Sequence, residues 1–414
     1  MARRLTPARD PVTIELDGQI VEAERGEPLA WALIASDRLA LARSPKLHRP
    51  HGPTCLRGGC DGCLSRVDGV PNVRTCLAPT RGGERVETQN GVGARDADLL
   101  RVTDWFFPHG FDHHHLLVGV PGVGSVMTRL ARRMGGLGRL PDDPHPAPPA
   151  ARREVDLLVV GAGAAGLVVA HRAASAGLST LVVDDAPAPG GSLRARGPNA
   201  AESFVARARG AGATLLASAT AAGVYDAEVL VVDASGATIV RPRRLVLASG
   251  AHDGLLPFAG NDVPGVTSAR AAALLACHGI AIGARIAIVG DGPYARALAL
   301  QLEGHAELTR LPASRELVVR GAARVRGVEL GGERHRVDAV CVEVPGAPAF
   351  ELAVQAGARA SLDLARGGYV PHADGDGRVR EGVYCAGEVA GTGSDLDAIV
   401  AQAERVAAAV VTSR

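Results

Sequence analysis

The chain has 414 residues, and its 45 lysines and arginines nearly balance its 44 aspartates and glutamates, for a formal net charge of +1. This balance gives no sign of a nucleic-acid or anionic-membrane partner, and we expect neither. No apolar run of about 18 residues occurs, so the sequence predicts no transmembrane segment. The length suffices for two or three domains with sizeable cores, and we expect a cytoplasmic protein.

The N-terminal part of the chain has the pattern of a small mixed fold. Residues 11–22 alternate apolar and polar side chains around a central Asp-Gly pair, which predicts a hairpin with a two-residue turn. A short helix is expected over residues 27–34, and residues 86–89 could supply a closing strand. Hairpin, helix and cysteine-rich loop in this order are typical of a β-grasp ferredoxin domain. We place that domain at residues 1–97.

Four of the 7 cysteines lie within 22 residues, at Cys55, Cys60, Cys63 and Cys76. Random scattering would place roughly 0.4 of a cysteine in that window. The C-x4-C-x2-C spacing matches the plant-type [2Fe–2S] ligand run, and the interleaved glycines permit a tight loop. Zinc and disulfides are the alternatives, although a zinc ribbon normally carries two C-x2-C knuckles. We therefore predict a [2Fe–2S] cluster, which is a one-electron carrier.

Residues 98–150 form a connecting segment that holds four of the 12 aromatic residues, three of them adjacent at residues 105–107. The adjacent histidines His113–His115 cannot all face one metal from a regular element, so we interpret them as surface or packing residues. The aromatic run Trp105–Pro108 is a candidate docking surface, and the alternative is ordinary core. Five prolines in residues 141–150 predict an extended spacer and a domain boundary.

The next segment carries a dinucleotide fingerprint. An apolar strand runs directly into residues 161–166, GAGAAG, and a helix and a second strand follow. Asp184 lies 23 residues after Gly161, where the fingerprint carries an acid for a ribose hydroxyl. Gly161 permits the turn, Gly163 lets the backbone approach the pyrophosphate, and Gly166 lets the helix pack on the strand. A glycine-rich turn without a ligand is the alternative.

The fingerprint alone does not decide between FAD and NAD, but three later stretches favour FAD. They are residues 189–191, 245–251 and 382–388, and the last of them leads into a helix. Two-dinucleotide flavoproteins return to their FAD domain at such places, so we expect an FAD domain in two parts, residues 151–275 and 346–414. The candidate FAD-binding residues are Gly161, Gly163, Ala164, Ala165, Gly166, Asp184, Asp185, Gly190, Gly191, Ser249, Gly250, Gly387 and Glu388.

Residues 276–345, between the two FAD segments, contain a second strand–turn–helix that opens at Arg285. An NAD(P)H domain belongs at this point of a two-dinucleotide flavoprotein. Here Ala295 replaces the third glycine of the fingerprint. At the expected phosphate position, Asp291 adds a negative charge and Tyr294 takes up space. The next strand carries no clear ribose-binding acid, and the segment is short. We interpret it as a degenerate nucleotide domain and NAD(P) as a doubtful third cofactor.

Four stretches resemble the alpha subunit of heterotetrameric sarcosine oxidase, namely residues 41–52, 86–90, 247–253 and 257–266. The ferredoxin cysteines look instead like those of its relatives opine oxidase, hydroxyproline dehydrogenase and hydrogen cyanide synthase. The resemblance covers nearly the whole chain, which stops before the aminomethyltransferase-like half of the sarcosine oxidase polypeptide. It implies an α/β fold: a β-grasp [2Fe–2S] domain joined to a two-dinucleotide, Rossmann-like flavoprotein with a shortened second nucleotide domain.

In this family the amine is oxidised in a separate FAD-containing subunit that resembles D-amino-acid oxidases. The resemblance therefore implies that this chain is the electron-transfer subunit of a heteromeric amine or amino-acid dehydrogenase or oxidase, with further small subunits. The likeness of residues 382–388 to two-dinucleotide flavoproteins implies that Glu388 holds the ribityl chain, although Asp is usual there. No catalytic residue is assigned, because no substrate-binding arginine or base is recognisable near the flavin segments. The alternatives are an NAD(P)H-dependent ferredoxin reductase fused to its ferredoxin and a non-catalytic scaffold.

Overall fold

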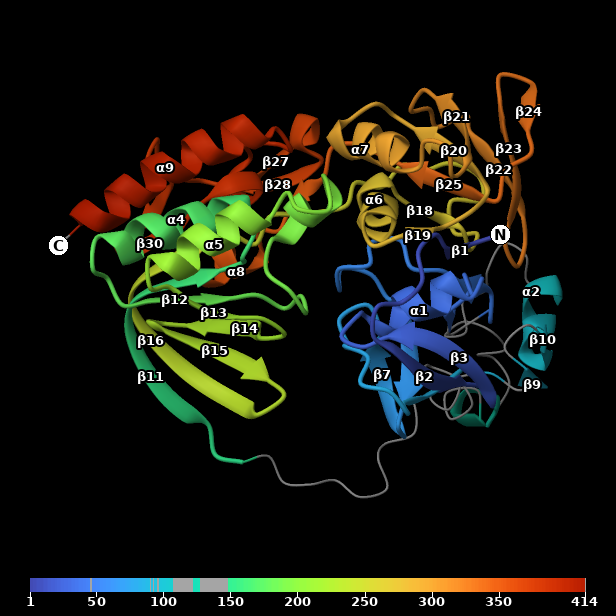
Figure 1. Cartoon of the computed structure of the whole chain (residues 1–414), viewed down its shortest axis with the longest axis horizontal. Helices are drawn as coiled ribbons and strands as arrows, with labels where there is room; N and C mark the ends of the chain where they lie inside the picture. Colours follow the sequence, from blue (N-terminus) through green and yellow to red (C-terminus); the bar gives the residue numbers. More distant parts are fainter. Residues whose placement is uncertain are drawn as a thin grey trace.

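Three lobes make up the molecule in the computed structural model (Figure 1). The ferredoxin-like lobe is blue, the first nucleotide lobe is green with the red C-terminal segment, and the second nucleotide lobe is orange. The predicted histidine run at residues 113–115 and most of the proline-rich spacer lie outside the described residues. The structure describes residues 1–44, 47–89, 91, 93–94, 97–106, 122–126 and 148–413.

The ferredoxin-like lobe is a five-stranded sheet in the order β3-β2-β8-β6-β7, with helix α1 packed on it. The predicted hairpin is confirmed, and its turn residues Asp17 and Gly18 both have positive φ, as a type I′ turn requires. The elements are β2 (Pro11–Leu16), β3 (Gln19–Glu24), α1 (Leu29–Ala35), β4 (Ala42–Arg43), β5 (Pro50–His51), β6 (Leu64–Val67), β7 (Val70–Arg74), β8 (Arg85–Glu87), β9 (Gly93–Ala94), β10 (Ala97–Asp98) and α2 (Val102–Phe106).

The first nucleotide lobe is organised around a sheet in the order β13-β12-β11-β16-β15-β14, with β30 paired to β16. Strands β13, β12, β11, β16 and β30 are parallel. The apolar runs of β12, β11, β16 and β30 are buried because helices cover the sheet. The elements are β11 (Ala151–Val160), α4 (Ala164–Ser175), β12 (Thr180–Val183), α5 (Glu202–Gly210), β13 (Thr214–Leu216), β14 (Thr220–Tyr225), β15 (Glu228–Asp233), β16 (Gly236–Leu247), α8 (Glu351–Gln355), β27 (Ala360–Asp363), β28 (Gly368–Pro371), β29 (Arg378–Arg380), β30 (Val383–Cys385) and α9 (Leu396–Thr412).

The second nucleotide lobe has a four-stranded parallel sheet in the order β18-β25-β20-β21. Strand β18 and helix α6 belong to this sheet and its cover, so the lobe begins before the predicted boundary at residue 276. The elements are β17 (Ala251–His252), β18 (Val266–Ser268), α6 (Ala269–Cys277), β20 (Arg285–Val289), α7 (Pro293–Gln301), β21 (Glu307–Leu311), β22 (Val318–Gly321), β23 (Val325–Leu330), β24 (Glu333–His335), β25 (Ala339–Val342) and β26 (Ala347–Pro348).

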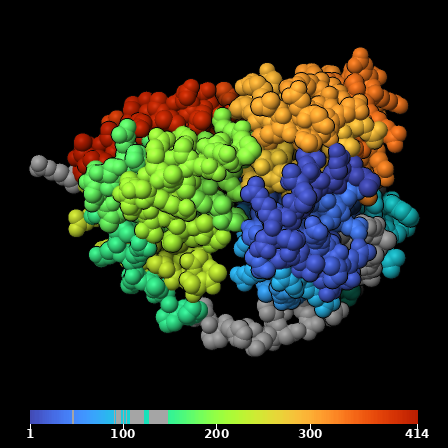
Figure 2. Space-filling model, in the orientation of Figure 1, coloured from blue at the N-terminus to red at the C-terminus, as the bar shows by residue number. Residues whose placement is uncertain are grey.

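The ferredoxin-like lobe is docked on the second nucleotide lobe, and the two share one hydrophobic core that joins Trp31 and Leu33 to Leu274 and Ile280. Strand β1 (Arg3–Arg4) pairs with β19 (Ile280–Ala281) across the boundary. Figure 2 shows the blue and orange lobes in contact along this face. In the described part of the chain, no helix is both long and apolar enough to cross a membrane.

Candidate cofactor sites

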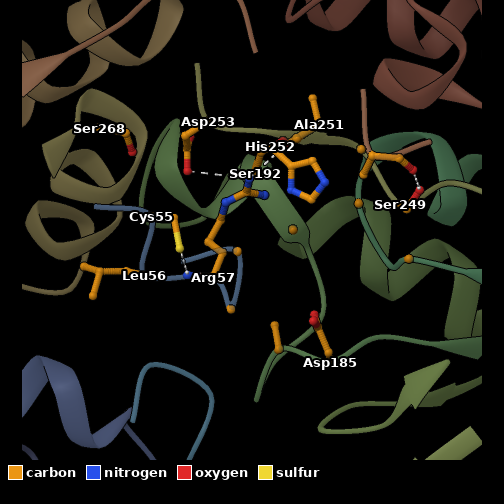
Figure 3. A pocket seen from close by; sticks show the side chains of 18 of the residues that line it. Cys55, Leu56, Arg57, Asp185, Ser192, Ser249, Ala251, His252, Asp253 and Ser268 are labelled. Carbon is orange, nitrogen blue, oxygen red and sulfur yellow. Dashed lines mark hydrogen bonds and ion pairs between the residues drawn. The ribbon is translucent and has the colours of Figure 1, made fainter. Parts of the chain in front are cut away.

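A cavity of about 630 Å³ lies between the ferredoxin-like lobe and the first nucleotide lobe (Figure 3). Cys55, Cys60 and Cys76 line it from the cysteine loop, and Gly161 and Gly163 line it from the glycine fingerprint. This volume is within the range of about 300–1,000 Å³ that is usual for ligand pockets. The two sites predicted separately from the sequence therefore open into one space.

The four predicted iron ligands come together as two thiol pairs. The Sγ atoms of Cys55 and Cys60 are 3.4 Å apart, and Cys63 is hydrogen-bonded to Cys76. The Cys55 thiol lowers the pKa of Cys60 to about 5, and the Cys76 thiol likewise lowers the pKa of Cys63. Among the described residues, no group of three or more His, Cys, Asp or Glu forms a single-ion site. Within each pair the pKa of the other cysteine, Cys55 or Cys76, is raised by its partner and by burial. Two neighbouring pairs of cysteine sulfurs suit the two irons of a [2Fe–2S] cluster.

Backbone amides and one arginine complete the cysteine loop. The N–H of Gly58 donates to Sγ of Cys76 at 3.2 Å, and the N–H of Arg57 donates to Sγ of Cys55 at 3.4 Å. Such hydrogen bonds stabilise thiolate and tune a cluster's potential. The Arg57 side chain crosses to the flavin segment, where its Nη2 donates to the carbonyl of Ala251 at 2.7 Å (Figure 3). The cysteine loop is thus hydrogen-bonded to β17, which directly follows the cavity-lining residues Ser249 and Gly250.

The three fingerprint glycines meet different surroundings. A Cβ atom at Gly161 would lie 2.3 Å from the carbonyl oxygen of Ala248, and one at Gly166 would lie 1.9 Å from the carbonyl oxygen of Gly161. These two positions therefore need glycine for packing. A Cβ at Gly163 would meet no atom within 4 Å, and Gly163 lines the cavity. At this position the room is left for a ligand, which is what a pyrophosphate needs at the N-terminus of α4.

The acid of the fingerprint is buried under the glycine turn. Asp184 accepts hydrogen bonds from the N–H groups of Ala162 at 2.6 Å and Ala186 at 2.9 Å. Burial raises the pKa of Asp184 to about 6, and the neighbouring Asp185 adds to the shift. Burial also raises the pKa of Asp185, against the attraction of Arg57. Both carboxylates line the cavity, and carboxylate oxygens keep further lone pairs for a hydroxyl.

The remaining predicted residues divide into two sets. One set lines the cavity, and these residues are Ala164, Ala165, Gly191, Ser249, Gly250 and Glu388. The other set lies in packing contacts behind the cavity wall: Gly190 donates its N–H to the Ala162 carbonyl, while Gly387 donates its N–H to Oε1 of Gln402. Four predicted residues do not line the cavity, namely Cys63, Gly166, Gly190 and Gly387, and the others do.

Sequence reasoning missed Arg270, on helix α6, whose side chain is 5% exposed. Its Nε donates to Oδ1 of Asp253 at 2.7 Å and its Nη2 donates to the Ala251 carbonyl at 3.0 Å. Its guanidinium also lies 3.6 Å from Glu388, so it fixes the acid predicted to face the ribityl chain. His252, missed as well, lines the cavity and contacts Glu351 at 3.0 Å. His252 lies in the stretch 247–253 that resembles the sarcosine oxidase alpha subunit, but that resemblance assigned it no role, and no motif surrounds Arg270.

Comparisons with known proteins define the two building blocks. Residues 9–91 match the family of 2Fe-2S iron-sulfur cluster binding domains, and residues 159–204 match the family of NAD(P)-binding Rossmann-like domains. The predicted architecture, a ferredoxin-like domain followed by a Rossmann-like flavoprotein fold, is confirmed. The matches also agree with the two predicted cofactors, a [2Fe–2S] cluster and FAD.

Two curated proteins that match this chain belong to the kinds of polypeptide that the sequence resembled. The alpha subunit of sarcosine oxidase from Rhizobium meliloti (strain 1021) is 29% identical over 334 residues, which are 73% of this chain and 34% of that protein. A subunit of opine oxidase from the same organism is 34% identical over 154 residues, which are 33% of this chain and 34% of that protein. The resemblance to these two kinds of polypeptide is confirmed. The chain spans about a third of the length of these curated relatives.

A solved structure shares the fold over almost the whole chain. The crystal structure of L-proline dehydrogenase from P. horikoshii superposes with a TM-score of 0.72 at 22% identity. The match covers 94% of this chain and 70% of that one. The likeness therefore extends across the ferredoxin-like lobe and both nucleotide lobes.

Proposed function

We propose that the chain is the electron-transfer subunit of a heteromeric amine or amino-acid dehydrogenase or oxidase, of the sarcosine, opine or hydroxyproline type. Such a complex is an oxidoreductase acting on CH–NH donors. One observation carries the proposal: the cysteine loop and the glycine fingerprint line the same cavity. When bound there, FAD accepts electrons in pairs and a [2Fe–2S] cluster passes them singly, so this chain would join two-electron to one-electron chemistry.

Each predicted site residue receives a role in this proposal. The four cysteines of the loop hold iron, with the amides of Arg57 and Gly58 directed at the sulfurs. The open position at Gly163 and the first turn of α4 receive the FAD pyrophosphate. Asp184 or its neighbour Asp185 accepts a ribose hydroxyl, and Glu388 faces the ribityl chain. The FAD-binding set is the predicted one, Gly161 to Gly166, Asp184, Asp185, Gly190, Gly191, Ser249, Gly250, Gly387 and Glu388.

The geometry between the two sites is held by this chain's own contacts. Arg57 links the cysteine loop to Ala251, beside the flavin segment. Thr54, next to the first cysteine, accepts a hydrogen bond from the N–H of Ser268 at 2.9 Å. Both contacts fix the cluster loop to β17 and β18, and Ala251 and Ser268 themselves line the cavity, so the contacts hold the loop at the cavity. A site carried by well-packed, hydrogen-bonded elements holds its geometry better than one on a free loop.

The proposed partner is a D-amino-acid-oxidase-like flavoprotein that has its own FAD and oxidises the amine to an imine, releasing two electrons. Further small subunits complete the complex, and both relatives are named as single subunits of larger enzymes, which fits such an assembly. Trp105 and Phe106 are 80% and 75% exposed, and we assign the docking of the partner to them. The free cysteines of the cluster loop favour the cytoplasm, where thiols stay reduced.

Anaerobic titration of the purified chain tests the proposal. Sarcosine, proline, hydroxyproline and opines should each leave the flavin of the isolated chain oxidised, because the amine is oxidised elsewhere. The same amines should bleach it once the flavoprotein partner is added. Bleaching by any amine without a partner would refute the division of labour. Rapid bleaching by NADH would instead support the ferredoxin reductase alternative.

A further inference from the structure

The two nucleotide folds of this chain are built alike but differ at the phosphate position. In each, a parallel strand ends in a glycine turn that opens a helix: β11 leads to α4, and β20 leads to α7. In the first fold, the Cβ position at Gly163 is open. In the second, a Cβ atom at the equivalent Gly292 would lie 2.1 Å and 2.8 Å from the two carboxylate oxygens of Glu343. The second phosphate position is therefore already filled by a side chain.

Glu343 is bound there as an anionic ligand would be. Its Oε2 accepts the N–H of Ala295 at 2.5 Å, and its Oε1 accepts the N–H of Tyr294 at 3.3 Å. These amides belong to the first turn of α7, which carries the positive end of the helix dipole and binds phosphate in open folds of this type. Glu343 itself directly follows β25, and its N–H donates to the Val289 carbonyl at 2.8 Å. The neighbouring strand thus aims the carboxylate at the helix.

The space beside this position also disfavours a dinucleotide. A second cavity, of about 360 Å³, adjoins Gly292 and Tyr294. Carboxylates outnumber guanidinium groups on its wall, and like charges repel the two phosphates of a dinucleotide at short range. The acidic residues on the wall are Asp253, Asp291, Glu343 and Glu388, and the basic residues are Arg270 and Arg366.

We infer that Glu343 closes the second nucleotide fold with its own carboxylate, so that this lobe takes no NAD(P)H or other dinucleotide. Glu343 is therefore a specificity determinant, because it prevents NAD(P)H from binding to this lobe and reducing the chain. Electrons then enter through the first cavity. Asp291 and Tyr294, which the sequence pointed to, flank the position but do not fill it. The inference concerns a lobe that the proposed function leaves unassigned and stands apart from it.

Calorimetric titration of the FAD-loaded chain tests this inference, with inorganic pyrophosphate as the probe for the phosphate position and NADH for the whole site. FAD fills the first fold, so that new binding reports on the second. Glu343→Ala removes the carboxylate, and Glu333→Ala on β24 is the matched control, because that side chain is 83% exposed in the same lobe. Wild type and the control should show no saturable binding. Glu343→Ala should bind pyrophosphate saturably, with an affinity at least about tenfold above the detection limit that applies to wild type.

Two results would overturn the inference: no gain in pyrophosphate binding for Glu343→Ala, or saturable binding of NADH to the FAD-loaded wild type. If the alanine variant does not fold, Glu343→Asp makes the same test, since it withdraws the carboxylate by one methylene and should also gain pyrophosphate binding. If the chain failed to hold FAD, pyrophosphate binding in the first fold would be equal in wild type and variant. The difference between them would still report on Glu343 alone.

Discussion

Replacing Gly163 by valine should remove the flavin while leaving the fold intact. The backbone at Gly163 has φ −78° and ψ −172°, an extended conformation that a branched residue adopts without strain. No atom lies within 4 Å of the added Cβ, so the side chain has room in the protein itself. That room is the part of the cavity that we assign to the pyrophosphate. The substitution therefore separates a binding role from a structural one.

The two effects can be sized from the structure. For stability, the entropy lost by the unfolded chain on replacing glycine favours the folded state by about 0.4–1 kcal/mol, and the poorer N-cap at the start of α4 costs a similar amount. The free energy of unfolding should thus change by less than about 1 kcal/mol. For binding, two charge-assisted hydrogen bonds to the pyrophosphate, each about 1.5–3 kcal/mol, would be lost. A loss of about 3 kcal/mol weakens FAD more than 100-fold.

The assay measures the ratio of flavin to protein after gel filtration, together with the denaturant midpoint of the FAD-free chain. Gly210→Val is the matched control, because a Cβ at the end of α5 also meets nothing within 4 Å but faces solvent. Gly166→Ala should behave differently and unfold the lobe, since its methyl would collide with a backbone carbonyl. Full retention of FAD by Gly163→Val would show that the pyrophosphate lies elsewhere.

Two further predictions concern the cluster and the buried acid. Metal analysis should give about two irons and two sulfides per chain, and Cys60→Ser should abolish the paramagnetic signal of the reduced cluster while FAD stays bound; one zinc without sulfide would contradict this. Because burial raises the pKa of Asp184 to about 6 from 3.8, the FAD-free chain should lose up to about 3 kcal/mol of stability as the pH rises from about 4 to 6. The sign follows from the unfolded chain, which releases this proton at lower pH than the folded chain does. Denaturant titrations of wild type against Asp184→Asn measure the effect, and a difference between them that stays constant over this pH range would contradict the burial argument.

Contiguous stretches of the sequence were sufficient to predict the two building blocks. The turn at Asp17-Gly18, the cysteine spacing and the residues 161–166 all depend on neighbours within a few positions. Backbone sterics and the periodicity of strands and helices act over the same short range, so these patterns predict their local structure without knowledge of the rest of the fold. The ligand set Cys55 to Cys76 could likewise be proposed from spacing alone, because Cys55, Cys60 and Cys63 share one loop and the short hairpin β6–β7 returns the chain to Cys76.

Tertiary structure alone decided how the building blocks meet. The proline-rich spacer predicted a domain boundary but not which lobe the ferredoxin domain contacts, and in the structure that domain shares a core with the second nucleotide lobe. The contact from Arg57 to Ala251 spans 194 positions, and the contact from Glu343 to the amide of Ala295 spans 48. Arg57 lies inside the C-x4-C run, but the spacing of the cysteines says nothing of its partner, and Glu343 lies in no motif. Their partners depend on which strands are neighbours, and for Glu343 these are β25 and β20. The order of strands in a sheet depends on how the whole chain buries its apolar residues. A short stretch of sequence does not contain that information.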